Sequence, residues 1–437
     1  MRHVLSGLSG ARRLAGASGV LLAGRIAGAA ASFVFAVMLA RTLPQPEVGL
    51  ALTAISSAFL ASVLITLNVE SGSIRFLVAA KEAQKTDAVG GFIYFGRLLL
   101  LCMAPIVVSG YAVLAIVEGN AARTVVIACA AASIPAMGWL RLSGSHATAL
   151  GKPAIGSLPR TALQPLLLLI LFPLSLAAGA AASAELALGC FLASFVATAV
   201  VQFVLIRKHI GPGASQRRDF SDWREWLANG FFMSPIILLQ EYLQHGVVIA
   251  AAIALNASEV ALLAISLRFI SLVRFGILAV NMAASPALSR AVARADHSER
   301  DKQLRAAALL KAPAAALACL VIAFLAEPIL ALFGPDYVGG GKALAWFTLI
   351  PLSSAVFGPN QLLLNISGAR SWVFGVSLGA ILLAFIAIPA AGTLHGVEGA
   401  AMAASLAFAA WEAALFVTVR TKFGVDASLF AVFGRRS

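Results

Sequence analysis

The chain has 437 residues, of which 60% are hydrophobic and only 12% are charged. A mean hydropathy of +0.93 excludes a soluble globular protein and indicates a polytopic membrane protein. The apolar runs exceed the ~20 residues that a spanning helix needs and lack the alternation of barrel strands, so we expect an all-α integral membrane fold. The net charge of +13 comes from basic residues between these runs, which favours topology determination over a nucleic-acid partner.

The apolar runs predict about twelve transmembrane helices. Their approximate limits are residues 17–40, 47–69, 89–117, 121–142, 156–178, 183–206, 229–255, 259–288, 306–334, 341–366, 371–392 and 397–420. We therefore expect two bundles of helices with basic segments at the ends and between them. The predicted parts are a cytoplasmic N-terminus (1–16), a first bundle (17–206), a cytoplasmic linker (207–228), a second bundle (229–420) and a cytoplasmic tail (421–437).

The distribution of Lys and Arg predicts the orientation of these spans. Most of the 32 basic residues fall in the termini and in alternate loops on one side of the membrane. The opposite loops hold only Arg41, Arg123 and Lys342. By the positive-inside rule, both termini are expected in the cytoplasm.

The linker contains an amphipathic segment at residues 219–226 (DFSDWREW). An Asp or Ser here is a suitable N-cap for a short helix, and Trp223 and Trp226 suit the lipid headgroup layer. Two interpretations follow: a sensor of the lipid surface, or an interfacial lead-in to the seventh span.

The two halves of the chain resemble each other. Residues 46–52 (PEVGLAL) open the second span, and residues 258–264 (SEVALLA) open the eighth. An even number of spans returns the chain to its starting side, so the halves are predicted to be parallel repeats about an axis along the membrane normal. Such repeats suit a transporter whose site lies at the repeat interface.

Ionisable side chains occur in the middle of the seventh and eighth spans. The seventh carries Glu241 and His245 on one face, with Gln240 and Gln244 on the adjacent ridge, and the eighth carries Arg268. Such groups are costly near the bilayer midplane and are often functional. One hypothesis is a buried Glu241–Arg268 pair that fixes helix packing. The other is a hydrated cavity in which Arg268 meets an anionic substrate while Glu241 and His245 exchange a proton or cation.

Other arginines lie closer to the cytoplasmic face. Arg25, Arg97 and Arg160 are near the starts of their helices, where long side chains snorkel to the headgroups. For Arg25, two interpretations remain: its side chain snorkels to the headgroups, or it lines the cavity. Arg274 follows Arg268 by a rotation of about 240°, so the two need not share a helix face.

The tenth span contains a helix-breaking pair. Gly358-Pro359 interrupts the hydrogen-bond ladder, and Asn360, Gln361 and Asn365 can satisfy the freed groups or line a cavity. A functional hinge and a passive kink both remain open.

The remaining acidic residues of the spans, Glu327, Glu398 and Glu412, lie nearer helix ends and receive no role. No Walker A loop, zinc-ligand spacing or nucleophile elbow occurs. We therefore expect neither an enzyme nor a cofactor or metal site.

Several segments resemble bacterial polysaccharide-transporter flippases of the Wzx type. These segments are residues 333–341 (FGPDYVGGG) with Ala343-Leu344, Gly358-Pro359 with residues 362–365 (LLLN) and Gly368, residues 396–401 (GVEGAA), and residues 254–286. The likeness covers nearly the whole chain and is strongest over residues 254–423.

This resemblance places the chain in the superfamily that contains multidrug/toxin extruders and lipid II flippases (MOP). It implies about 12 transmembrane helices in two six-helix bundles around a central cavity, with alternating access. It also implies a bacterial inner-membrane flippase that moves undecaprenyl-pyrophosphate-linked oligosaccharide to the periplasmic leaflet for O-antigen (lipopolysaccharide), capsule or exopolysaccharide assembly. The expected partners are this lipid-linked glycan, H+ or Na+, membrane lipids, and the polysaccharide polymerase and export machinery.

The resemblance also suggests roles for individual residues. Arg25, Arg268 and Arg274 would bind the pyrophosphate, while Glu241 and His245 would couple ion movement. The alternative function is a cation-coupled multidrug or metabolite antiporter of the extruder type, which would need a net acidic cavity. A membrane scaffold or glycan polymerase is a third hypothesis, and the short periplasmic loops argue against it.

Overall fold

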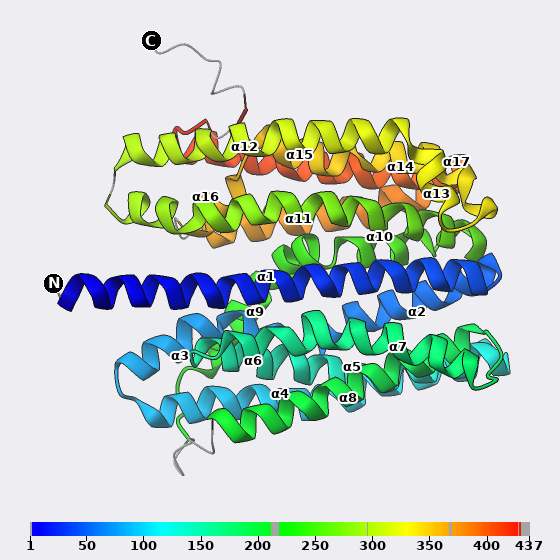
Figure 1. Ribbon diagram of the computed structural model, residues 1–437, viewed down its shortest axis with the longest axis horizontal. Helices are drawn as coiled ribbons and strands as arrows, with labels where there is room; N and C mark the ends of the chain where they lie inside the picture. Colours follow the sequence, from blue (N-terminus) through cyan, green and yellow to red (C-terminus); the bar gives the residue numbers. More distant parts are fainter. Residues whose placement is uncertain (1, 211–217, 295, 367–368, 427, 430–437) are drawn as a thin grey trace. The chain divides into compact units, whose positions relative to one another are not determined.

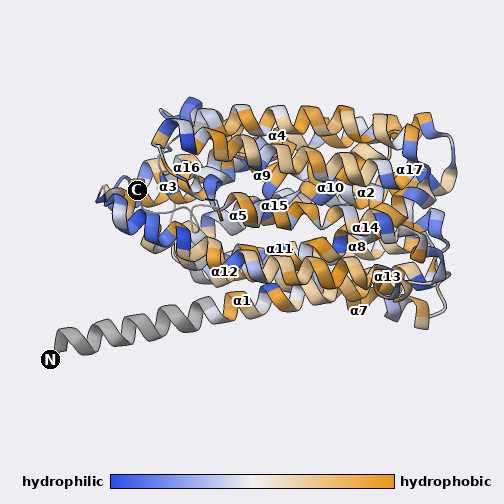
Figure 2. Cartoon of the chain, turned by 90° about the horizontal axis from the view of Figure 1, so that it is seen from above, coloured by the Kyte–Doolittle hydropathy of each residue, from blue (hydrophilic) through white to orange (hydrophobic). Residues whose placement is uncertain are grey.

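The computed structural model describes residues 2–210, 218–294, 296–366, 369–426 and 428–429, and in this part of the chain all regular structure is helical (Figure 1). The helices are hydrophobic over most of their length, with hydrophilic residues gathered toward their ends (Figure 2). A backbone in lipid must satisfy its polar groups internally, which helices do without a partner. The expected all-α membrane fold is confirmed.

The first half of the chain forms eight α-helices. They are α1 (Arg2–Thr42), α2 (Gln45–Leu64), α3 (Ser73–Glu82), α4 (Thr86–Glu118), α5 (Ala121–Ala149), α6 (Pro153–Leu158), α7 (Gln164–Ala177) and α8 (Ala184–Ile210). A 3-10 turn, η1 (Val69–Gly72), precedes α3, and a π-helical turn, η2 (Pro159–Leu163), joins α6 to α7.

The second half is more interrupted. Its helices are α9 (Trp223–Glu241), α10 (Leu243–Ala251), α11 (Ala257–Ala293), α12 (His297–Phe324), α13 (Ala326–Ala331), α14 (Gly341–Phe347), α15 (Leu349–Phe357), α16 (Asn360–Ile366) and α17 (Arg370–Phe423), with a 3-10 turn, η3 (Pro335–Gly340), before α14.

Nine helices in the described residues are long and apolar enough to cross a membrane. The longest, α17, covers the last two expected spans, with non-helical backbone at His395 and Gly396 between them. The expected eighth span corresponds to α11. The expected seventh span is not continuous, because it is divided between α9 and α10 at Tyr242.

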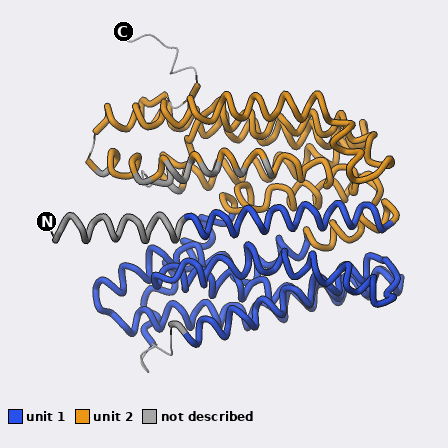
Figure 3. Tube along the Cα trace, viewed as in Figure 1, with its two compact units in different colours: residues 1–43, 57–234 blue, residues 44–56, 235–437 orange. Residues whose placement is uncertain are grey.

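The chain divides into two compact units, shown in different colours in Figure 3. The first comprises residues 1–43 and 57–234, and the second comprises residues 44–56 and 235–437. The second unit therefore includes the first part of α2, and the chain passes from one unit to the other within α9. The predicted boundary at the linker 207–228 lies before this crossing.

In the described part of the linker, residues 223–228 belong to α9. Residues 211–217 lie outside the described residues, and α9 starts at Trp223 and continues toward the seventh span. Trp223 is exposed, but Trp226 is buried, and its ring meets Phe92 edge-on at 5.2 Å between centroids. The segment therefore leads into α9, and only one of its two tryptophans is available to a lipid surface.

The first unit contains a buried ion pair. Arg141 of α5 donates to Glu70 through Nε (2.9 Å) and through Nη2, and Nη2 also reaches the Asn68 side chain (3.3 Å). Both charged side chains are less than a tenth exposed. A buried charge persists when it is paired and hydrogen-bonded, and this pair meets both conditions.

In the second unit, α2 lies close against the start of α11. A Cβ added to Gly49 would come within 1.8 Å of the Ala257 carbonyl oxygen, so only glycine permits this approach. Asn256 and Glu259 form a capping box that starts α11 at Ala257. The acidic residue of the second repeat motif, Glu259, therefore has a structural role as part of a helix cap.

Candidate functional site

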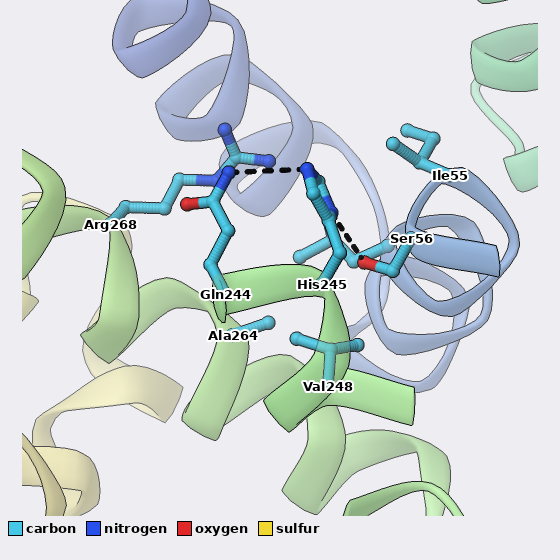
Figure 4. A pocket seen from close by; sticks show the side chains of 8 residues that line it. Ile55, Ser56, Gln244, His245, Val248, Ala264 and Arg268 are labelled. Atoms are coloured by element: carbon cyan, nitrogen blue, oxygen red, sulfur yellow. Dashed lines mark hydrogen bonds between the residues drawn. The ribbon is translucent and has the colours of Figure 1, made fainter. Parts of the chain in front are cut away.

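A polar pocket lies entirely within the second unit. It is formed by α2, α10 and α11, is partly open, and has about 280 Å³ of empty space among its walls when the adjoining open solvent is included. The lining residues are Leu52, Ile55, Ser56, Gln244, His245, Val248, Ala264 and Arg268 (Figure 4). Three of the residues that the sequence singled out, Gln244, His245 and Arg268, therefore meet in one place.

The break between α9 and α10 sets the position of two of these side chains. Tyr242 has φ −116° and ψ 13°, which ends α9 and starts α10 at Leu243. Gln244 and His245 consequently lie in the first turn of a short new helix. The close approach at Gly49 keeps α2 near the start of α11, and Ser56, farther along α2, reaches His245.

A chain of hydrogen bonds orients the polar side chains. Ser271 donates to the amide oxygen of Gln244 (3.0 Å), so the amide nitrogen of Gln244 faces Nε2 of His245 (3.3 Å). An amide nitrogen only donates, and His245 Nε2 must therefore accept. Nδ1 then carries the ring proton and donates to the Ser56 hydroxyl (3.1 Å). The arrangement requires a neutral imidazole.

Arg268 supplies the positive charge of the pocket. In Figure 4 its guanidinium extends over Gln244 toward His245, on which its charge acts. None of the described residues that line the pocket is acidic. A guanidinium offers several donors in a planar fork that matches carboxylate and phosphate oxygens, so this pocket suits an anionic group.

Two predicted neighbours of this site lie outside the pocket. Glu241 is the last residue of α9 and is exposed, as is Gln240. Because Tyr242 interrupts the helix, the four-residue spacing of Glu241 and His245 does not put both side chains on the same wall of the pocket.

The other two predicted arginines also lie outside the pocket. Arg274 donates to the carbonyl oxygens of Leu239 (3.4 Å) and Gln240 (3.0 Å), near the end of α9. Those carbonyls belong to the last turn of a helix, where no following turn donates to them. Arg25 lies on α1 in the first unit and is half-buried.

The Gly-Pro pair of the tenth span breaks the helix as its chemistry suggests. Gly358 has φ 85°, α15 ends before it, and α16 begins at Asn360. Asn360 is buried and donates to the Phe357 carbonyl (2.6 Å), while its own amide oxygen and the amide nitrogen of Gln361 are buried without a partner among the described residues. The side chain of Asn365 lies outside the described residues.

This unit also contains a second group of charges, which was not predicted from the sequence. Lys311 of α12 and Glu412 of α17 are both buried, and each acts electrostatically on the other. Lys311 follows Ala-Leu-Leu and precedes Ala-Pro. A single basic residue inside an apolar run was therefore the sequence feature that could have indicated this buried charge. Glu412 has a similar setting, in Ala-Trp-Glu-Ala-Ala.

No protein-family model and no curated protein sequence matches the chain, whereas solved structures do. An inward-facing multidrug resistance MATE family transporter of the MOP superfamily shares 13% identity at a TM-score of 0.73, over 90% of this chain and 94% of that one. Lipid II flippase MurJ in an inward closed conformation shares 14% identity at a TM-score of 0.72, over 92% and 87% of the two chains.

A third similar structure is a MOP superfamily transporter from Pyrococcus furiosus, with 12% identity, a TM-score of 0.65 and 95% of both chains covered. For that transporter, a reverse polarity of the binding pocket suggests a different function. At these identities the likeness establishes the fold. The chain is a multi-pass membrane protein with the fold of MOP superfamily transporters, which confirms the broader part of the sequence-based expectation.

Proposed function

We propose that this protein is a flippase that moves undecaprenyl-pyrophosphate-linked oligosaccharide from the cytoplasmic to the periplasmic leaflet of the bacterial inner membrane, for O-antigen, capsule or exopolysaccharide assembly. It works by alternating access driven by an ion gradient or the membrane potential, with both termini in the cytoplasm. Arg268 binds the pyrophosphate, and Gln244 and His245 orient the site. Arg25 and Arg274 contribute further positive charge in another conformation, and Glu241 takes part in ion coupling.

The observation that carries this proposal is the sign of the Arg268 pocket. It contains a guanidinium and a neutral imidazole, and its described lining residues include no carboxylate. A site for cationic drugs would need the opposite sign, because like charges repel strongly in a low-dielectric environment. The Wzx-like segments of the sequence and the fold shared with a lipid II flippase both support a lipid-linked pyrophosphate substrate.

Deletion of the gene in its host provides the first test. We expect an oligosaccharide linked to undecaprenyl pyrophosphate to accumulate on the cytoplasmic face, and the corresponding surface glycan to disappear. Complementation with Arg268→Ala should give a protein at its normal level in the membrane that does not restore export. Arg290→Ala is the matched control, because Arg290 is exposed on the same helix, and it should restore export fully.

The same experiment evaluates the alternative of a cation-coupled multidrug or metabolite antiporter, which the MATE-like fold favours. An antiporter predicts no accumulated lipid-linked oligosaccharide and a changed sensitivity to toxic cations. That outcome, or full export by Arg268→Ala, would overturn the flippase assignment.

A further inference from the structure

A second buried charge cluster lies in the second unit, apart from the residues that line the Arg268 pocket. It consists of Arg274 on α11, Lys311 on α12 and Glu412 on α17. The helices α12 and α17 each pack against α11 and α15 (Figure 1), so the three residues lie on helices of one packed group. Lys311 is 2% exposed and Glu412 is 6% exposed.

Lys311 makes no direct contact with an acidic side chain or hydrogen-bond acceptor among the described residues. Its Nζ is shielded from solvent and makes no hydrogen bond to any described residue. The nearby Glu412 carboxyl acts on Lys311 electrostatically. Glu412 in turn interacts with the Ser354 side chain of α15 and with the positive charge of Arg274. The described charged groups that face Lys311 from the surrounding helices are therefore Glu412 and, beyond it, Arg274.

With Glu412 kept ionised by the nearby charge of Arg274, the balance of charge within this cluster depends on the proton of Lys311. With every group ionised, the buried Lys311 and Glu412 and the half-buried Arg274 together carry one excess positive charge, which is costly in a low-dielectric environment. A guanidinium keeps its charge in proteins, whereas a buried lysine readily becomes a neutral amine. The cluster is thus neutral when Lys311 is an amine and carries one excess positive charge when Lys311 binds a proton.

Arg274 connects this cluster to the pocket helices. Its guanidinium donates to the Leu239 and Gln240 carbonyls at the end of α9, just before the break at Tyr242. The turn that follows the break carries Gln244 and His245. Glu412 acts on Arg274 electrostatically, so a change in this interaction acts on the segment that positions the pocket.

We propose that Lys311, Glu412 and Arg274 form a buried proton-exchange site, in which the Lys311 amine takes up and releases one proton beside the Glu412 carboxylate. Proton binding converts the amine to an ammonium and requires no other reactant. The ammonium competes with Arg274 for Glu412, which loosens the hold on Arg274 at the α9–α10 break. The use of this step to drive transport rests on the proposed function, but proton uptake by the site does not.

The test is a difference acid–base titration of the purified full chain in lipid nanodiscs, without any glycan substrate. Compared with Lys311→Met, the wild type should bind about one more proton per chain within about pH 6 to 9, the range to which burial can bring a lysine. Lys311→Arg should show no such proton, because arginine does not titrate there. Lys302→Met is the control, since Lys302 is 76% exposed on the same helix, and it should match the wild type in this range.

Equal titration of the wild type and both Lys311 variants would overturn the proposal. So would a difference present in gluconate buffer and abolished in chloride, because a bound chloride would then keep the ammonium permanently charged. If Lys311→Met does not insert into the membrane, the comparison of the wild type with Lys311→Arg still tests the proposal. Since no glycan is present, a positive titration with no glycan transport would contradict the proposed function alone.

Discussion

Each compact unit buries a pair of opposite charges, but the two pairs are built differently. In the first unit, Arg141 and Glu70 touch through two nitrogens of the guanidinium, and Asn68 accepts a further hydrogen bond. In the second unit, Lys311 and Glu412 interact electrostatically, but the Lys311 ammonium makes no hydrogen bond to a described residue. In the first pair the two charges neutralise each other through direct hydrogen bonds. In the second pair the Lys311 amine has no such bond within the described chain and can bind or release a proton.

This difference separates a structural role from a functional one. A directly paired buried arginine holds elements together, because removal of either partner leaves a buried charge unpaired. An unpaired buried lysine contributes little to stability and is free to change its protonation state. Substitutions at the two pairs distinguish these roles.

Arg141→Leu should destabilise the first unit by about 3–5 kcal/mol, because it leaves the Glu70 carboxylate buried without its guanidinium. Unfolding of the purified protein in detergent, followed by circular dichroism, measures this loss. The double variant Glu70→Leu with Arg141→Leu should recover most of the stability, since no buried charge remains. If the single variant were as stable as the wild type, the pair would not have the structural role assigned to it.

Lys311→Met should behave in the opposite way. Replacement of an unpaired buried ammonium by an apolar side chain of similar length should leave the free energy of unfolding within about 1 kcal/mol or raise it. Transport by the same variant should nevertheless fall severely, as measured by export of surface glycan in the deletion strain. A loss of stability as large as that of Arg141→Leu would show that the two pairs do not differ in kind.

Ser56→Ala should have the smallest effect. It removes the acceptor of the His245 Nδ1 proton, a hydrogen bond worth about 1 kcal/mol, and leaves Arg268 in place. We expect a several-fold decrease in transport at unchanged protein level. Ser62→Ala is the control, because Ser62 lies on the same helix and, among the described residues, donates to the Phe59 carbonyl of its own helix. Equal transport activity of the two variants would show that the hydrogen bond that orients His245 does not contribute to transport.

The all-helical membrane fold could be predicted from the sequence because long apolar runs leave few alternatives. Charges in the middle of such runs also stand out, which is why His245 and Arg268 were found. Gly358-Pro359 marked the break between α15 and α16 for an equally direct reason, since both residue types disrupt a helix.

Other features depend on how helices pack and leave little trace in one sequence. In the sequence, Ser56 does not differ from other serines in helices, and it reaches His245 only because α2 lies close to α10. The break at Tyr242 has no Gly or Pro at that position, so Glu241 and His245 were expected on one helix face. Lys311 and Glu412 lie about 100 residues apart in the chain and meet only because α11 and α15 bring α12 and α17 together.

The most direct test of the proposed function is transport by the purified protein in proteoliposomes that contain undecaprenyl-pyrophosphate-linked oligosaccharide in one leaflet. The wild type should deliver this lipid to the opposite leaflet when a proton gradient or potential is applied. Arg268→Ala should be slower by roughly tenfold or more, because a charge-assisted bond of about 1.5–3 kcal/mol is lost, while Arg290→Ala should match the wild type. Equal rates for the wild type and Arg268→Ala, or no delivery by the wild type, would contradict the account.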